Sequence, residues 1–269
     1  MARYTLGHHD SVLRSHRWRT AENSAGYLLP HLRSGMNVLD VGCGPGTITR
    51  DFARIVGPTG RVAGLDQSAE VLDEARGDAE AAGITNVDFL VGDIMALDVA
   101  DGTYDVVHAH QVLQHLPDPV GALGHMRRIT APGGLVAARD ADYAAMAWFP
   151  ADPALDRWLE VYRAIARRNG TEPDGGRHLL SWALQAGLVG VEASASAWCY
   201  STPAECRWWG DLQADRITGS AITGQIVEAG LADARELAEM GAAWRRWADA
   251  EGAWFGILHG EILFRVPRH

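Results

Sequence analysis

Cysteine is scarce in this chain, and its scarcity excludes two kinds of architecture. The 269 residues include three cysteines, Cys43, Cys199 and Cys206, which lie far apart. Three widely spaced thiols do not form a disulfide framework, and they do not supply the clustered ligands of a metal site. We therefore expect a protein of the reducing cytoplasm that holds no metal ion.

Long apolar runs are also missing. A helix needs about 18 to 20 apolar residues to cross a bilayer, and the sequence contains no such stretch. The first ten residues, MARYTLGHHD, lack the apolar centre of a signal peptide. The expectation is a soluble cytoplasmic protein without a membrane span.

Positive charge is in deficit as well. Lysine and arginine together number 24 against 34 aspartates and glutamates, which gives a net charge of -10 and a pI near 5.5. Binding of nucleic acid phosphates requires a basic surface, so we expect no nucleic acid partner. With 47% hydrophobic residues, the chain is long enough to bury one large α/β core with a modest insertion.

Glycine, in contrast, is concentrated in residues 36–46, Met-Asn-Val-Leu-Asp-Val-Gly-Cys-Gly-Pro-Gly. The apolar run at the start predicts a buried parallel strand, and residues 47–56 read as a helix. The alternating glycines between them permit a sharp turn and a close approach to a ligand. A strand, a glycine turn and a helix N-terminus together form a nucleotide-binding element.

The spacing of this turn is Gly-x-Gly-x-Gly, and Asp40 precedes it by two residues. At the end of the strand, the Asp40 carboxylate is expected to face the ligand, where an acid repels phosphate and suits a cation. The pattern resembles the first motif of the class I S-adenosylmethionine-dependent methyltransferases, in particular the ubiquinone and menaquinone biosynthesis (type 11) subfamily. The cofactor of that family carries a sulfonium and an ammonium but no phosphate, so the electrostatics agree. The resemblance implies S-adenosylmethionine as donor, S-adenosylhomocysteine as product, and Asp40, Gly42, Cys43 and Gly44 as cofactor residues.

Two later acids follow predicted strands in the same order as in that family. Asp66 ends the strand predicted for residues 61–66, and a carboxylate at this place binds the ribose hydroxyls in doubly wound folds. Gln67, next to it, is included among the cofactor residues. The resemblance assigns Asp93 to the exocyclic amine of adenine and Ile94 to the face of the ring.

The resemblance also implies that the N-terminal segment folds over the cofactor. Arg19 is then a candidate for the cofactor's carboxylate, and His8 or His9 for the rim of the pocket. His110 and Gln111 end the strand predicted for residues 103–110, at the sheet edge where open α/β folds bind ligands.

Methyl transfer from a sulfonium is an in-line displacement that depends mainly on placement, and a base assists when the acceptor is a hydroxyl or an activated carbon. His110, His8 and Tyr143 are the candidate catalytic groups, and a histidine is preferred because its pKa lies near operating pH. Asp142 and His178 are further titratable groups that the sequence does not rank. His115 is expected to order its loop.

Five strand–helix repeats predict an α/β fold with a doubly wound, mostly parallel sheet of seven strands. Helical periodicity over 152–169, 175–187 and 203–250, with strands over 188–200 and 254–266, completes the chain. The predicted organisation is an N-terminal helical cap (1–35), a cofactor-binding core (36–200), a helical lid (201–252) and a final core strand (253–269).

Ten tryptophans are present, and half of them lie in or beside the predicted lid. They could line a pocket for a hydrophobic or aromatic small-molecule acceptor, since aromatic side chains supply large contact areas. Helix packing and a homodimer interface are alternative uses.

Two other functions stay open. A nicotinamide-dependent oxidoreductase is disfavoured by the glycine spacing, by Asp40 and by the lack of a Tyr-x-x-x-Lys pair. A non-catalytic module that binds S-adenosylmethionine would retain the same cofactor residues, so only an identified acceptor distinguishes it from an enzyme.

Overall fold

The computed structural model describes residues 15–268 of the chain. The predicted roles of His8 and His9 therefore lie outside the described residues.

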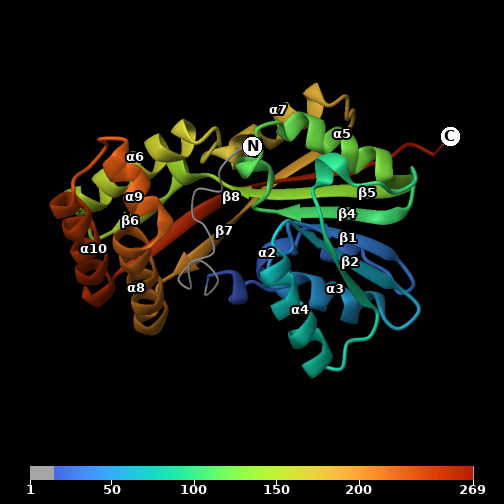
Figure 1. Cartoon of the computed structure of the whole chain (residues 1–269), viewed down its shortest axis with the longest axis horizontal. Coiled ribbons are helices and arrows are strands. Elements are labelled where there is room, and N and C mark those ends of the chain that lie inside the picture. Colours follow the sequence, from blue (N-terminus) through green and yellow to red (C-terminus); the bar gives the residue numbers. More distant parts are fainter. Residues whose placement is uncertain (1–14, 269) are drawn as a thin grey trace.

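A single mixed sheet forms the centre of the molecule (Figure 1). Its strands are β1 (Asn37–Val41), β2 (Arg61–Asp66), β3 (Val87–Val91), β4 (Tyr104–His110), β5 (Thr130–Ala141), β6 (Ala147–Phe149), β7 (Glu192–Tyr200) and β8 (Trp254–Arg265). The order is β3-β2-β1-β4-β5-β8-β6, and β7 also pairs with β8. The first five strands are parallel, and β8 runs antiparallel to β5, β6 and β7. The predicted doubly wound, mostly parallel sheet is confirmed.

The sheet contains eight strands, one more than predicted, but the short strand β6 does not make it wider. Phe255 and Gly256 of β8 pair with β6 and also with β7, so these two strands occupy opposite edges of β8. Further along, β7 and β5 flank β8 in the same way. Strand β6 therefore continues the line of β5, and the sheet is seven strands wide as predicted.

Helices cover both faces of the sheet (Figure 1). One face carries α2 (Ala21–Ala25), α3 (Thr47–Val56) and α4 (Ala69–Ala81), and the other carries α5 (Pro119–Ile129) and α7 (Gly175–Gln185). Single 3-10 turns are η1 (Leu29–His31), η2 (Ile94–Ala96), η3 (Leu113–His115) and η4 (Tyr143–Ala145). The helix α3 has the predicted bounds, and it begins directly after the glycine turn.

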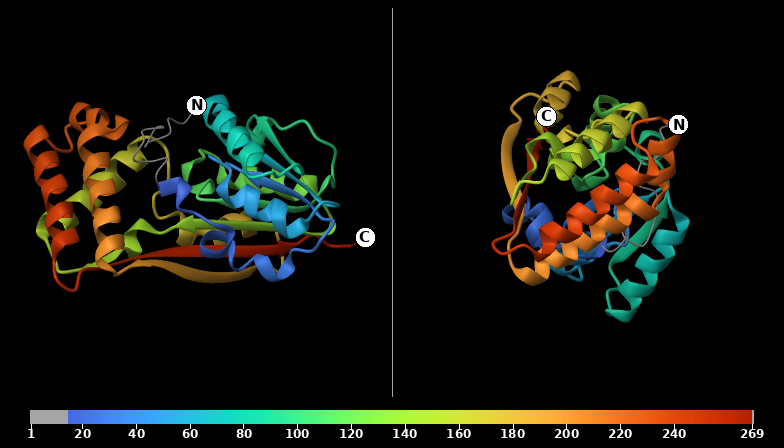
Figure 2. Two further views of the ribbon diagram at one scale, coloured as in Figure 1. Left: turned by 90° about the horizontal axis from the view of Figure 1, so that it is seen from below. Right: turned by 90° about the vertical axis from the view of Figure 1, so that its left-hand side faces the viewer.

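A helical bundle lies at one end of the sheet, above the extended ends of β7 and β8 (Figure 2). It consists of α6 (Pro153–Arg168), α8 (Pro203–Gly219), α9 (Ala221–Glu228) and α10 (Ala234–Asp249). The stretch predicted as helical over 203–250 thus holds three helices. Trp158 and Trp244 are buried here and meet edge to face, with ring centroids 4.9 Å apart. For these tryptophans, helix packing is the use that the structure shows.

Within residues 15–268, no helix is both long enough and apolar enough to cross a membrane.

Candidate functional site

A cavity of about 570 Å³ opens at the carboxyl ends of β1, β2 and β4 and extends to the helical bundle. The predicted cofactor residues all line it, and so does Tyr143. They are Arg19, Asp40, Gly42, Cys43, Gly44, Asp66, Gln67, Asp93, Ile94, His110 and Gln111. Residues that are spread over about 90 positions of the sequence therefore meet at one place.

The glycine turn forms the floor of this cavity because its backbone excludes side chains. Gly42, Gly44 and Gly46 have φ values of 64°, 53° and 70°, which lie in the left-handed region. A Cβ atom on Gly42 would come within 2.4 Å of Val112, and one on Gly46 within 2.8 Å of Phe89. At Gly44 the nearest atom is 3.6 Å away, so the left-handed backbone, rather than a steric clash, favours glycine there.

Asp40 lines the cavity, but its carboxylate is held within the protein. One oxygen accepts from the Thr49 hydroxyl at 2.6 Å, and the other lies 2.8 Å from Nδ1 of His108. The residue is 2% exposed. Its negative charge therefore acts on the cavity from within the protein. The prediction that this carboxylate faces the ligand directly is wrong.

Asp66 is fixed at the end of β2 by two backbone donors. Its oxygens accept from the N–H groups of Gly44 (2.9 Å) and Ser68 (3.0 Å). Ser68 also caps α4. The carboxylate is thereby tied to the glycine turn and keeps a defined orientation at the cavity wall.

Asp93 and Ile94 occupy the end of β3. The Asp93 carboxylate accepts from the backbone of Met95 at 2.9 Å and so caps the turn η2. Ile94 is 4% exposed and presents an apolar surface to the cavity.

Arg19 reaches the cavity from the N-terminal segment. It donates to the side-chain oxygen of Gln111 at 2.9 Å, and its guanidinium lies 5.8 Å from the ring centre of Trp198. Gln111 has a φ of 54°, the one positive φ among the described non-glycine residues. Backbone strain of this kind concentrates at functional sites because the surrounding structure must maintain it.

His110 is a buried imidazole in the cavity wall. It is 4% exposed, and neither ring nitrogen has a hydrogen-bond partner. Its ring lies 5.6 Å from Trp198 and 6.1 Å from His259, measured between centroids. Burial lowers the pKa of His110 well below its usual value, and the charges of Arg19 and Arg139 lower it further. The side chain is therefore neutral at pH 7 and has one nitrogen lone pair to offer.

The far end of the cavity is formed by residues that the sequence did not place individually, although it offered the tryptophans in and beside the predicted lid as possible pocket residues. They are Trp198 and Tyr200 of β7, Trp209 and Arg216 of α8, and Ile257 of β8. The sequence predicted a strand that ends at Tyr200 and a tryptophan-rich helical stretch. No local signal showed that these side chains face the cavity.

Other titratable candidates have different roles. Asp142 binds Arg177 through both oxygens, at 2.6 and 2.8 Å, and His178 stacks on Trp182 of α7. Neither lines the cavity. His115 lines the cavity and lies 3.1 Å from the Gln114 amide, and burial lowers its pKa to about 4. Its loop-ordering role stays a prediction.

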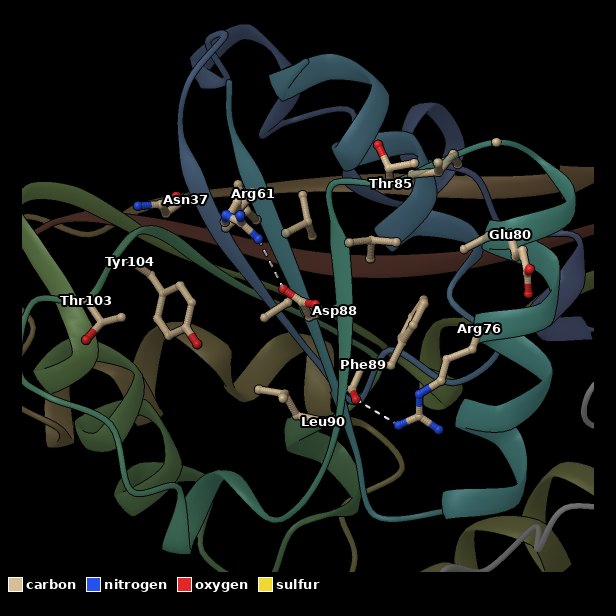
Figure 3. A pocket seen from close by; sticks show the side chains of 17 residues that line it. Asn37, Arg61, Arg76, Glu80, Thr85, Asp88, Phe89, Leu90, Thr103 and Tyr104 are labelled. Carbon is tan, nitrogen blue, oxygen red and sulfur yellow. Dashed lines mark hydrogen bonds and ion pairs between the residues drawn. The ribbon is translucent and has the colours of Figure 1, made fainter. Parts of the chain in front are cut away.

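A second hollow of about 740 Å³ lies at the opposite, amino-terminal edge of the sheet (Figure 3). Arg61 there faces Asp88 at 3.7 Å, and Arg76 donates to the carbonyl of Phe89 at 2.8 Å. No residue that lines this hollow has a buried side-chain polar atom without a partner. Nothing among its lining residues therefore requires a ligand.

No group of three or more histidine, cysteine, aspartate or glutamate side chains in the described part of the chain is arranged to hold a metal ion.

Comparison with known proteins agrees with this geometry. A family model described as a methyltransferase domain matches residues 32–187. An uncharacterized methyltransferase of Schizosaccharomyces pombe is 34% identical over 270 residues, which cover 97% of this chain and 96% of that protein. A demethylmenaquinone methyltransferase of Lactococcus lactis is 34% identical over 129 residues, 48% of this chain and 49% of that one.

A solved structure has the same fold. It is the phosphoethanolamine N-methyltransferase 2 of Haemonchus contortus in complex with phosphomonomethylethanolamine and S-adenosylhomocysteine. The TM-score is 0.56 at 15% identity, over 88% of this chain and 50% of that one. At this identity the likeness concerns the fold alone.

Proposed function

We propose that this chain, which belongs to the class I S-adenosylmethionine-dependent methyltransferases, methylates a small aromatic or hydrophobic acceptor. The methyl group goes to an oxygen or carbon atom of the acceptor, which binds beside His110. The methyl donor of the family is S-adenosylmethionine, and the product is S-adenosylhomocysteine. Family membership excludes the nicotinamide-dependent oxidoreductase. It also makes the protein an enzyme.

The observation that carries the proposal is the continuity of the cavity. One end presents the glycine turn, Asp66 and Asp93, and the other end presents aromatic side chains and His110. A donor and an acceptor can thus lie in one enclosed space, as an in-line displacement requires.

The cofactor end has the donors and acceptors that S-adenosylmethionine needs. Asp66 is oriented by two backbone N–H groups to accept from the ribose hydroxyls. Asp93 would accept from the adenine amine, Ile94 would pack on the ring, and Arg19 would bind the carboxylate. When bound, the cofactor supplies an activated methyl group on a positively charged sulfur.

The protein's own contribution to the reaction is placement and proton transfer. His110 is neutral, so it can accept the proton of an acceptor hydroxyl at a ring nitrogen while the oxygen attacks. The surrounding aromatic residues exclude water from this point. Tyr143, stacked on Tyr162 at a centroid distance of 4.4 Å, stays a second candidate for contact with the acceptor.

The test combines binding and turnover. Calorimetry with S-adenosylhomocysteine should detect binding to the wild-type protein and to His110→Gln, whereas labelled methyl transfer to a panel of phenols, quinols and amines should be strongly reduced in the variant. An unaltered rate in His110→Gln would contradict the assignment of the base. The homodimer stays a prediction, which sedimentation of the purified protein would test.

A further inference from the structure

We infer that the methyl acceptor is an aromatic hydroxy acid, whose ring lies against Tyr200 and Trp209 and whose carboxylate is recognised by Arg216. The inference rests on the proposed function and names the substrate class of the same site.

Charge divides the cavity into two unlike ends. Among residues 15–268, the acidic side chains that line it are Asp40, Asp66 and Asp93, and all three belong to the ends of β1, β2 and β3, where we propose that the cofactor binds. At the other end, Arg216 of α8 is 7% exposed and donates to the Ser15 hydroxyl at 3.2 Å. Arg19 adds a second positive charge near Trp198, and the described residues place no acidic side chain at this end. A buried cation in the wall repels an ammonium group and attracts a carboxylate.

The same end has a flat aromatic wall. The rings of Tyr200 and Trp209 stack with centroids 4.6 Å apart and an interplanar angle of 15°, and both line the cavity. Trp198 stands next to them and is fixed by its indole N–H, which donates to the Asn23 carbonyl at 2.6 Å. Such rigid aromatic surfaces favour a planar ligand.

Polar atoms without partners indicate where the oxygens of that ligand lie. The Tyr200 hydroxyl and the Trp209 indole N–H have no hydrogen-bond partner, although these residues are 0% and 5% exposed. Buried polar groups of this kind need a partner to offset the cost of their desolvation. An indole N–H is only a donor, and a phenol at neutral pH donates readily, so both suit an oxygen-rich, negatively charged ligand.

His110 provides the complementary group for the hydroxyl of the acceptor. Both of its ring nitrogens lack partners in the same wall. In the reaction, the acceptor oxygen forms a bond to the methyl carbon as the carbon–sulfur bond breaks, and the sulfur keeps the electron pair and becomes a neutral thioether. The hydroxyl proton passes to His110 and from there to solvent.

Isothermal calorimetry on the full chain saturated with S-adenosylhomocysteine tests the charge preference directly. The probes are 2-, 3- and 4-hydroxybenzoate, each with its matched hydroxybenzamide and hydroxybenzylamine. We expect at least one hydroxybenzoate to bind about tenfold or more tightly than its amide and also than its amine. A difference of this size corresponds to one charge-assisted hydrogen bond. If no acid binds more tightly than its amide and amine, the inference is wrong. Failure of S-adenosylhomocysteine itself to bind would refute the proposed function instead.

Variants locate the recognition. Arg216→Met should remove the preference for the acid, and Arg216→Lys should keep part of it. Arg207→Met is the matched control, because Arg207 is an exposed residue of the same helix that does not line the cavity. Tyr200→Phe keeps the ring and removes the hydroxyl, so it should weaken binding of the acid several-fold without affecting the cofactor. Retained affinity for S-adenosylhomocysteine shows that a variant is folded. An acid preference that survives in both folded Arg216→Met and Tyr200→Phe would overturn the assignment.

Discussion

Nε2 of His259 lies 3.0 Å from the side-chain nitrogen of Gln111, in a contact that joins the last strand to the end of β4. Nδ1 of His259 is 3.2 Å from the carbonyl of Ile257 and must donate to it, so Nε2 carries the lone pair. The Gln111 amide therefore donates to His259 and turns its oxygen towards Arg19, which donates to it at 2.9 Å. His259, which is 0% exposed, thus positions the guanidinium that we assign to the cofactor's carboxylate.

Substitution of His259 should weaken cofactor binding through this chain. His259→Phe removes the acceptor for the Gln111 amide, so Arg19 loses its orientation. We expect the affinity for S-adenosylhomocysteine to fall by about 0.5–1.5 kcal/mol, the net value of one hydrogen bond. Methylthioadenosine has no carboxylate, so calorimetry should give it an unchanged affinity. Equal losses for the two ligands would instead indicate a general disturbance of the cavity.

Asp66→Ala should weaken cofactor binding more strongly. The variant loses the proposed acceptor for the ribose hydroxyls, the contact with Gly44 of the glycine turn, and the contact with Ser68 at the start of α4. We expect a loss of roughly 1.5–3 kcal/mol in the binding of S-adenosylhomocysteine, the range for hydrogen bonds to a charged group. Asp73→Ala, in the exposed ion pair with Arg76, is the control and should bind normally. A normal affinity in Asp66→Ala would disprove the ribose assignment.

The turnover rate should not fall between pH 8 and pH 6.5 through protonation of His110. Burial and the neighbouring Arg19, Arg139 and His259 lower its pKa well below 6.5, so the neutral base is fully populated from pH 8 down to pH 6.5. Turnover of an O-methylated acceptor should therefore stay level over this range. His110→Gln should lower kcat by about 10²–10⁴-fold, as loss of a general base does. A wild-type rate that falls with a midpoint near pH 6.5, but is level in His110→Gln, would argue against a depressed pKa.

Asp140 should make the protein less stable as pH rises. Burial raises the pKa of this carboxyl from 3.8 to about 7, and the backbone hydrogen bonds from Gln114 and Val112 offset this rise only in part. The folded state therefore binds a proton that the unfolded state has lost, and its stability decreases between these two pKa values. Asp140→Asn removes this dependence. Relative to the variant, the wild type should lose about 2–3 kcal/mol between pH 5 and pH 8 in urea unfolding.

Asp101→Asn serves as the comparison for that experiment, because Asp101 is exposed and pairs with Arg128 at the surface. It should leave the difference between the two pH values close to that of the wild type. The proposed role of Asp140 fails if Asp140→Asn behaves in the same way.

The cofactor end of the site was accessible from the sequence because its signals are local. A glycine turn needs left-handed backbone within a few residues, and φ values of 64° to 70° at Gly42 and Gly46 agree with that need. The strand that ends at Asp66 and the helix over 47–56 have the predicted bounds, since a continuous apolar run and a helical repeat each specify their element directly. In a doubly wound sheet, the carboxyl ends of parallel strands then necessarily meet at one edge.

The acceptor end was decided by the tertiary structure. Tyr200 faces the cavity because β7 pairs with β8 in the register that sets Tyr200 opposite Phe255, and a shift of one residue would turn it to the other face. Ser15 and Arg216 meet across 201 positions of the sequence, and His259 reaches Gln111 across 148. The sequence by itself determined the fold and the proposed cofactor-binding edge through short-range backbone and hydrophobic patterns. Only the packing of the bundle and the final strands decided which side chains surround the proposed acceptor site, because contacts between distant segments depend on register and burial that no local pattern encodes.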